Sequence, residues 1–170
     1  MLKKIAIAVM LIIPMGIFAQ NLKFGHVASQ EIIVLMPEYA KAQTEIQALD
    51  KTYSDELRVI NEEITKKYQE FQQAMQDGSL PANIQERRQK EIQDLMEKSE
   101  QFQQDAYQKM QEKQQELLTP ILQKAENAVK EVGQAEGFIY IFDLSRTYIP
   151  YINENQSTDV TAKVKAKLGL

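Results

Sequence analysis

The sequence of 170 residues contains no cysteine and no tryptophan, and it has only one histidine, six glycines and five prolines. Without cysteine, the chain cannot be a disulfide scaffold, hold a metal through thiolates or use a cysteine nucleophile. The scarcity of glycine and proline argues against a domain of many short strands joined by turns. Hydrophobic residues make up 44% of the chain, which is ordinary for a folded protein. Together with the low glycine and proline counts, this fraction favours a mainly helical fold.

Residues 1–19 have the pattern of a secretory signal peptide. Lys3 and Lys4 are followed by the uncharged apolar run Ile5–Phe18 and by the small residue Ala19. A helix that spans a bilayer needs about 20 apolar residues, so an uncleaved membrane anchor is the weaker interpretation of this run. We therefore expect the chain to be exported, cleaved after about Ala19, and not inserted stably in a membrane afterwards.

Removal of this segment takes away two of the 20 basic residues and leaves 18 against 24 acidic ones, a net charge of −6. Proteins that bind duplex nucleic acid normally present a basic face, so nucleic acid is not an expected partner. Between residues 66 and 90, however, five basic residues outnumber three acidic ones. This excess is ordinary surface charge or a weak attraction for acidic partners or lipid surfaces. An exported protein without cysteine must also obtain its stability from packing or oligomerisation.

The mature chain is expected to form a long helical arm, 38–136, on a small α/β body made of 20–37 and 137–170. The arm has a turn signal at 77–81, where Asp-Gly-Ser-Leu-Pro predicts a tight connection at its tip. At about 1.5 Å per residue, the two helices would be roughly 58 and 83 Å long, too long for a compact globule of this size. They should therefore pair as an antiparallel hairpin, with a kink at Pro120 in the second helix.

The body is expected to contain short strands and short helical segments. The runs 22–28 and 138–142 predict strands, and 148–152 predicts a third, weaker one because it contains a proline. Residues 29–36 predict a capped helical turn, and 157–159 offer caps for a short terminal helix. The predicted fold class is thus mainly α with a small β base.

Apolar residues in the arm recur at steps of eleven, which corresponds to about 3.67 residues per turn and predicts a nearly straight helix pair rather than heptad winding. The first helix contains the rows Ile46, Leu57 and Tyr68; Leu49, Ile60 and Phe71; Tyr53, Ile64 and Met75. The second helix contains the row Ile84, Leu95, Ala106, Leu117 and Ala128. Because both helices share one spacing, we expect them to pack on each other along these rows.

A further row beside this seam contains Met96, Tyr107, Leu118 and Val129. One interpretation is that these residues broaden the core of the hairpin or meet another subunit. The other is an exposed apolar strip that holds a partner, for which methionine and tyrosine are well suited. Ten glutamines between residues 85 and 116 would surround such a strip with uncharged polar groups.

The sequence contains no recognisable catalytic or metal-binding pattern. His26 is the only histidine and lies in an expected strand, where a structural role is the simpler explanation. The carboxylates fall mainly on expected helix surfaces, without a phosphate-binding glycine loop or a metal-ligand spacing beside them. We therefore expect no enzyme activity, no metal and no cofactor.

The order and lengths of these segments resemble the OmpH/Skp-type family of periplasmic chaperones. The signal peptide and the charged helical hairpin carry the resemblance, together with the two ends of the mature chain, 24–37 and 138–161. The resemblance implies a jellyfish-like homotrimer, in which strands of three subunits form a barrel-like body and three helical tentacles surround a cavity. It also implies a periplasmic holdase whose clients are unfolded outer-membrane proteins and which needs no ATP.

The expected strand 138–142 has apolar residues on both faces. Phe138, Tyr140 and Phe142 would lie on one face and Ile139 and Ile141 on the other, and one small sheet cannot bury both faces within a single chain. Sharing strands between subunits would bury them. The residues expected at subunit contacts are Phe24, Val27, Phe138, Ile139, Tyr140, Ile141 and Phe142.

The negative charge of the mature chain departs from the best-known member of this family, which is strongly basic, so no lipid- or lipopolysaccharide-binding site is carried over. Client contacts should instead involve apolar and glutamine side chains of the arm. The candidate client-binding residues are Phe71, Met75, Met96, Tyr107 and Leu118. The alternative functions are a static coiled-coil spacer or assembly subunit of the envelope without a client, and an exported enzyme, for which the sequence offers no site.

Overall fold

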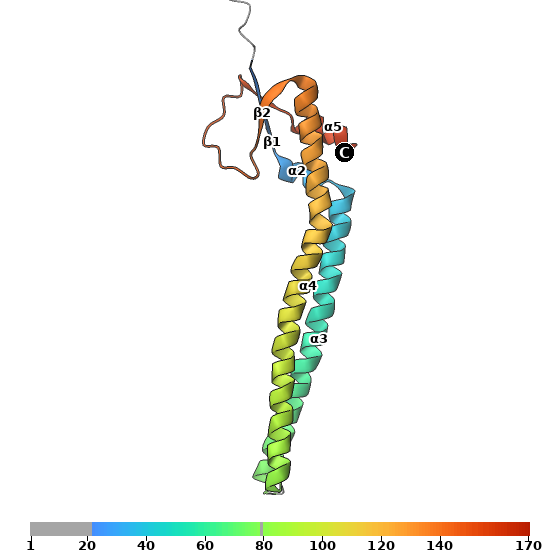
Figure 1. The fold of residues 1–170 in the computed structure, drawn as a ribbon, viewed down its shortest axis with the longest axis vertical. Coiled ribbons are helices and arrows are strands. Elements are labelled where there is room, and N and C mark those ends of the chain that lie inside the picture. Colours follow the sequence, from blue (N-terminus) through green and yellow to red (C-terminus); the bar gives the residue numbers. More distant parts are fainter. Residues whose placement is uncertain (1–21, 79) are drawn as a thin grey trace, which may run out of the picture.

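The computed structural model describes residues 22–78 and 80–170, so the expected signal peptide, 1–19, lies outside the described residues. The chain forms a long helical rod with a small α/β body at one end (Figure 1). In chain order the elements are β1 (Lys23–Val27), α2 (Ser29–Ile33), α3 (Pro37–Gln76), α4 (Ala82–Glu136), β2 (Phe138–Asp143), β3 (Ser157–Asp159) and α5 (Thr161–Leu168). The mainly helical class expected from the sequence is confirmed.

Prolines and glycines mark the ends of the two long helices. Pro37 lies in the first turn of α3, where its missing N–H would have no helical partner anyway. Gly78 in the turn at the tip has a φ of 62°, and Gly137 at the end of α4 has a φ of 72°, a left-handed conformation that favours glycine. α4 continues through Pro120 without a break, and the rod is gently curved (Figure 1).

α3 lies beside α4 and antiparallel to it, and α4 continues past the start of α3 to the body (Figure 1). Near the body, Lys124 of α4 donates a hydrogen bond to Glu38 of α3 at 2.5 Å. Near the tip, Lys67 of α3 pairs with Glu91 of α4, also at 2.5 Å. The order of these pairs reverses between the two helices, as an antiparallel hairpin requires.

The eleven-residue row predicted for α4 is confirmed, since its five members, Ile84, Leu95, Ala106, Leu117 and Ala128, are all half-buried or buried. In α3 the prediction is wrong near the tip, where Tyr68 and Met75 are 53% and 43% exposed. Their neighbours Lys67 and Ala74 are half-buried instead. From Tyr53 onward, the half-buried residues of α3 follow alternating steps of four and three, and this shorter repeat moves the seam by one residue.

The three strands form a parallel sheet in the order β2-β1-β3. β1 pairs first with Phe138 and then with Tyr140, which leaves Ile139 as an extra residue in a β-bulge. The bulge changes the faces of β2, so that Phe138 packs against the core together with Ile141 instead of sharing a face with Tyr140. The strict alternation expected for this strand is therefore wrong.

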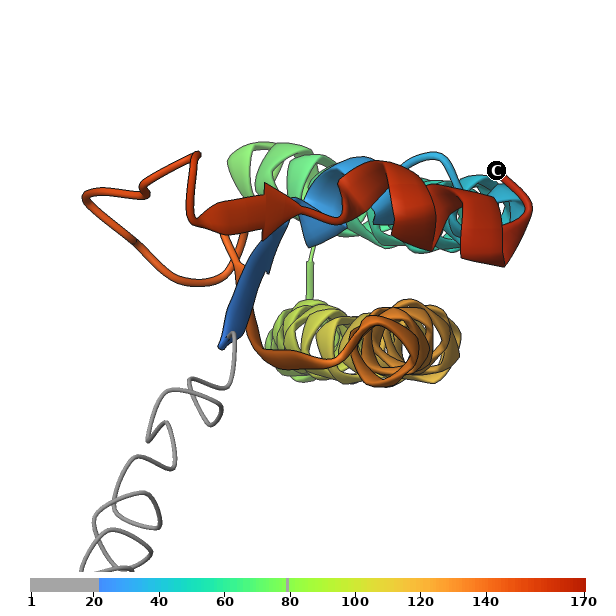
Figure 2. The same cartoon turned by 90° about the horizontal axis from the view of Figure 1, so that it is seen from above.

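The third strand also differs from the prediction. The observed third strand is β3, in which Ser157–Asp159 pair with Phe24–His26 of β1. The sequence predicted these residues only as caps of a short terminal helix. Residues 148–152 belong instead to a long loop, 144–156, because Pro150 lacks the N–H that a strand ladder needs. This loop stands to one side of the helical pair in both views (Figures 1 and 2).

The body and the adjoining end of the rod share two buried clusters. The first, which we call the upper cluster, contains Val27, Ile32, Ala128, Val132, Val160 and Val164. The second, the lower cluster, contains Ile33, Met36, Ala42, Ile121 and Ala125. Both clusters include residues of α4, so this end of the rod is part of the body's core, whereas among residues 22–78 and 80–170 the rest of each long helix packs on the other one.

Candidate functional site

The outer face of the sheet carries three neighbouring aromatic rings. The ring centroids of Phe24 and Tyr140 are 6.4 Å apart with an interplanar angle of 11°, and those of Tyr140 and Phe142 are 6.1 Å apart. The three side chains are 36%, 61% and 46% exposed in the same order. A contiguous aromatic face on such a small sheet is typical of a surface that another molecule covers.

The seven residues predicted at subunit contacts separate into two groups. Val27 belongs to the upper cluster, and Phe138 and Ile141 pack against it, so these three side chains serve the core of this chain. The exposed residues are Phe24, Ile139, Tyr140 and Phe142. Only this second group can contact another molecule without a rearrangement of the core.

A hollow of about 330 Å³ lies between the aromatic face and the loop 144–156. Its apolar lining consists of Phe24, Phe142, Ile149, Tyr151 and Ile152. His26 also lines it, and its Nδ1 lies 2.9 Å from the Oγ of Ser157. The single histidine therefore has a structural hydrogen-bond partner across two neighbouring strands.

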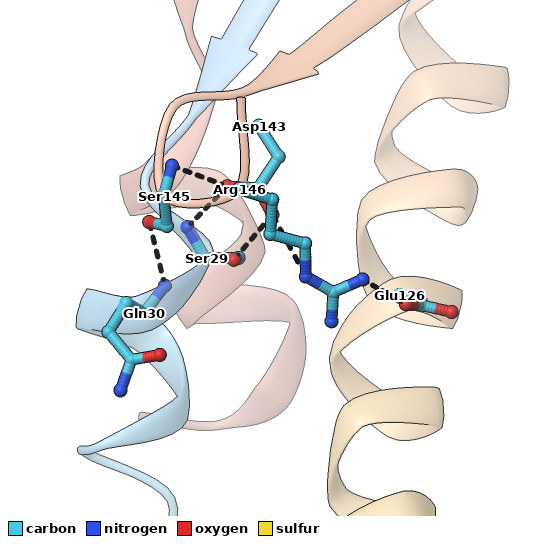
Figure 3. Close-up of polar contacts among 6 residues, drawn as sticks. All are labelled: Ser29, Gln30, Glu126, Asp143, Ser145 and Arg146. Carbon is cyan, nitrogen blue, oxygen red and sulfur yellow. Dashed lines mark hydrogen bonds and ion pairs between the residues drawn. The ribbon is translucent and has the colours of Figure 1, made fainter. Parts of the chain in front are cut away.

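Asp143, at the end of β2, connects the sheet to α2 (Figure 3). Its Oδ2 accepts a hydrogen bond from the Ser29 hydroxyl at 2.5 Å, and its Oδ1 accepts from the backbone N–H groups of Ser29 and Ser145 at 3.3 and 3.0 Å. The Ser145 Oγ accepts from the N–H of Gln30 at 3.1 Å. Because α2 has no side-chain cap at its own N-cap residue, these distant residues satisfy its first N–H groups.

Arg146 connects the contacts around Asp143, which we call the Asp143 corner, to the arm (Figure 3). Its Nη1 donates to Glu126 of α4 at 2.6 Å, and its Nε lies 3.6 Å from the Asp143 Oδ2. Both Arg146 and Glu126 are about half exposed, so this ion pair contributes little energy by itself. It marks the place where α4 passes beside the end of β2.

The five residues predicted to contact a client differ in their exposure. Met75, Met96 and Tyr107 are 43%, 53% and 67% exposed. Phe71 is half-buried on the seam between the helices. Leu118 is also half-buried and packs against the lower cluster. The first three are therefore available to a partner as they stand.

The body covers one end of the row that includes Met96 and Tyr107. Leu118 and Val129, at the body end of the row, pack against the lower and upper clusters. Met96 and Tyr107 lie farther along α4 and remain exposed. Val59 of α3, which no predicted row included, is exposed as well, by 56%.

Charged side chains of the arm form ion pairs on its surface. A hydrogen bond from Lys124 lowers the pKa of Glu38, and one from Lys67 lowers the pKa of Glu91. Since these groups are open to solvent, such pairs are worth little stability. In residues 22–78 and 80–170, no three histidine, cysteine, aspartate or glutamate side chains gather closely enough to hold a metal ion, and no helix has the length and apolar character to cross a bilayer.

Comparisons with known proteins agree with this architecture. A sequence model of the family described as "Outer membrane protein (OmpH-like)" matches residues 23–168. A crystal structure described as a candidate outer membrane chaperone (OmpH-like) from Caulobacter crescentus has a TM-score of 0.69 at 13% identity, covering 86% of this chain and 83% of that chain. At this identity the likeness shows a shared fold, and a comparison with curated proteins gives no match. The family match spans both the arm and the body, and the chain therefore belongs to the OmpH-like family, as its sequence predicted.

Proposed function

We propose that this chain is an ATP-independent holdase that binds unfolded outer-membrane proteins and prevents their aggregation. The arm carries the proposal, because among the described residues its helices pack on each other beyond the body and leave Met75, Met96 and Tyr107 exposed. Flexible and amphipathic side chains along a polar rod suit loose contacts with a client that has no fixed shape. Membership of the OmpH-like family supports the same role.

We infer that the protein acts in the periplasm. The pattern of residues 1–19 supports export with cleavage after about Ala19. Holding a client requires no catalysis, nucleotide or cofactor, because binding alone lowers the concentration of the species that aggregates. The protein is accordingly proposed to be a binding protein and not an enzyme.

We propose further that three copies join through their sheets. Within the part of the chain that the structure describes, the outer edges of β2 and β3 have no strand neighbour, and both strands run parallel to β1. β2 of one copy can therefore pair with β3 of the next in the same chain direction, and closing the ring removes the free edges. The exposed rings of Phe24, Tyr140 and Phe142 would then be covered inside the ring.

Light scattering tests the holding role. An unfolded outer-membrane barrel protein diluted from urea should aggregate more slowly when the mature chain is present without ATP. The double variant Met96→Ser/Tyr107→Ser should suppress scattering less, since both side chains are exposed and their loss leaves the seam intact, whereas Val59→Ser is a matched control. Full aggregation in the presence of the unaltered protein would contradict the holding role and favour a static spacer.

A further inference from the structure

We propose that a groove midway along the arm binds an extended client segment in which apolar residues alternate with lysine or arginine. The groove has a volume of about 380 Å³ and lies between α3 and α4. Its apolar lining consists of Tyr53, Leu57, Phe102, Ala106, Tyr107 and Met110. This inference rests on the holding role and narrows it to one site and one class of segment.

The lining has an inner part and a rim. Tyr53 and Phe102 are half-buried and meet edge to face, with ring centroids 6.0 Å apart, a favourable geometry for aromatic pairs. Tyr107 forms the rim, with 67% of its surface exposed. Its hydroxyl accepts a hydrogen bond from the Gln111 side chain at 2.6 Å, one turn further along α4. The exposed ring therefore has a polar partner that orients it beside the inner pair.

The dimensions of the groove suit a short extended segment. On α4 the lining runs from Phe102 to Gln114, a length of about 18 Å, which matches about five residues of extended chain. Side chains of an extended segment alternate between its two faces. Segments of outer-membrane barrels have this alternation of apolar and polar residues, so one face can enter the groove while the other faces solvent.

The charge around the groove selects among such segments. Asp50 is the only charged residue among the described residues that line it, and the remaining polar lining is Ser54, Gln103, Gln111 and Gln114. The surrounding stretches, 45–63 and 94–116, contain twelve acidic and five basic residues, a net charge of −7. Basic side chains on the outer face of a bound segment are attracted to this region, and acidic ones are repelled.

The same charge argues against a second copy of this chain as the occupant. Two arms that met through their grooves would bring two regions of net charge −7 together. The tip, 66–90, has five basic and three acidic residues, so its charge has the opposite sign. A preference for basic segments should therefore belong to the middle of the arm and not to its tip.

Three fluorescent peptides test this proposal against the mature, full-length protein. The first alternates valine and tyrosine with lysine, the second replaces each lysine by glutamate, and the third keeps lysine but replaces each apolar residue by serine. Fluorescence anisotropy should show the first peptide binding about tenfold more tightly than the second at low salt, with the difference shrinking as salt screens the charges. The third peptide should not bind, because charge alone does not fill the groove.

Four variants locate the site. Tyr107→Ser should weaken binding of the lysine peptide about fivefold, whereas Tyr107→Phe, which keeps the ring and loses only its hydrogen bond with Gln111, should weaken it less. Val59→Ser is the matched control, because Val59 is also exposed but lies two residues from Leu57, about 200° around α3. Asp50→Asn should reduce the difference between the lysine and glutamate peptides. Circular dichroism melts of each variant check that the hairpin is retained.

Equal binding of the lysine and glutamate peptides, or equal effects of Tyr107→Ser and Val59→Ser, would overturn the groove proposal. A change of oligomer mass in Tyr107→Ser with unchanged peptide affinity would overturn it as well and assign the groove to a contact between copies. The light-scattering assay separates these failures from a failure of the holding role, because it reports whether the unaltered protein holds a whole client at all.

Discussion

Two aspartates organise the body by accepting hydrogen bonds from backbone groups of other elements. Asp143 serves α2, and Asp159 accepts from the N–H of Thr161 at 2.8 Å at the start of α5. The Thr161 hydroxyl accepts in turn from the N–H of Ala28 at 3.0 Å, which links α5 to the end of β1. Single side chains therefore connect segments that lie more than a hundred residues apart in the sequence.

Replacement of Asp159 should reveal a pH-dependent contribution to stability. Hydrogen bonds from Thr161 lower the pKa of Asp159 below its ordinary value of 3.8, so folding favours the ionised carboxylate. Its contribution is complete above that ordinary value and is lost as the pH falls through the lowered pKa. Asp159→Ala should cost about 1 kcal/mol in the free energy of unfolding at neutral pH.

Urea unfolding measures this difference at several pH values. The gap in unfolding free energy between the unaltered protein and Asp159→Ala should narrow as the pH falls from about 7 to about 3. Asp94→Ala, on an exposed surface of α4, is the control and should show no comparable gap at neutral pH. A gap for Asp159→Ala that does not change with pH would contradict the assigned hydrogen bonds.

Loss of the Asp143 carboxylate should destabilise the body more strongly. Asp143→Ala would leave the hydroxyl of Ser29, which is only 7% exposed, without its acceptor, at a cost of about 2 kcal/mol. Asp143→Asn keeps an acceptor oxygen and should lose less. Urea unfolding of the two variants compares them, and an Asp143→Ala protein as stable as the unaltered one would show that the contact is not structural.

At the scale of the elements, regular segments were predictable and irregular ones were not. The two long helices follow from apolar spacing and from turn signals such as Gly137, which are local properties of the sequence. The bulge at Ile139 depends on a tertiary fit, because Phe138 occupies the space beside Gly25, where an added Cβ would lie 3.2 Å from its ring. No local pattern reports such a contact.

The candidate binding surfaces were likewise predictable only where they depend on one helix. The row containing Met96 and Tyr107 was predictable because its members lie on one helix at a fixed spacing. The mid-arm groove was not, since it requires the register between α3 and α4 that brings Tyr53 beside Phe102. The Asp143 corner was not predictable either, because Ser29 lies 114 positions away.

Pro120 offers a test of how the arm tolerates a defect in a continuous helix. A proline inside a helix removes one backbone hydrogen bond and crowds the preceding turn, so Pro120→Ala should raise the free energy of unfolding by about 1–3 kcal/mol. Pro37→Ala is the matched control and should give no gain, because Pro37 lies where no helical bond is lost. Thermal melts followed by circular dichroism would measure both changes, and equal effects would contradict this assignment.

At the scale of the whole molecule, the rod has little core of its own. Ala42 is the only buried residue of α3 among its described residues, and it lies near the body in the lower cluster. The sheet leaves an aromatic face uncovered, although the cores on its other side are closed. The proposed joining of copies at the body would cover this face and leave the arms free.

A charge placed on the aromatic face should therefore separate the copies. If copies join through this face, Tyr140→Glu would bury a carboxylate beside the rings of Phe24 and Phe142 at a large desolvation cost, and it should shift the protein to smaller species. Tyr68→Glu adds the same charge at an exposed tyrosine of the arm and should leave the assembly unchanged. Sedimentation velocity would compare the two, and an equal response would contradict an interface at the sheet.

The most direct measurement is the native mass of the purified mature protein, by light scattering coupled to size-exclusion chromatography. Sharing of the three-stranded sheets through the outer edges of β2 and β3 predicts a mass of three chains, independent of dilution over the working range. A single-chain mass would contradict it, because the aromatic face of Phe24, Tyr140 and Phe142 would then have no partner to cover it.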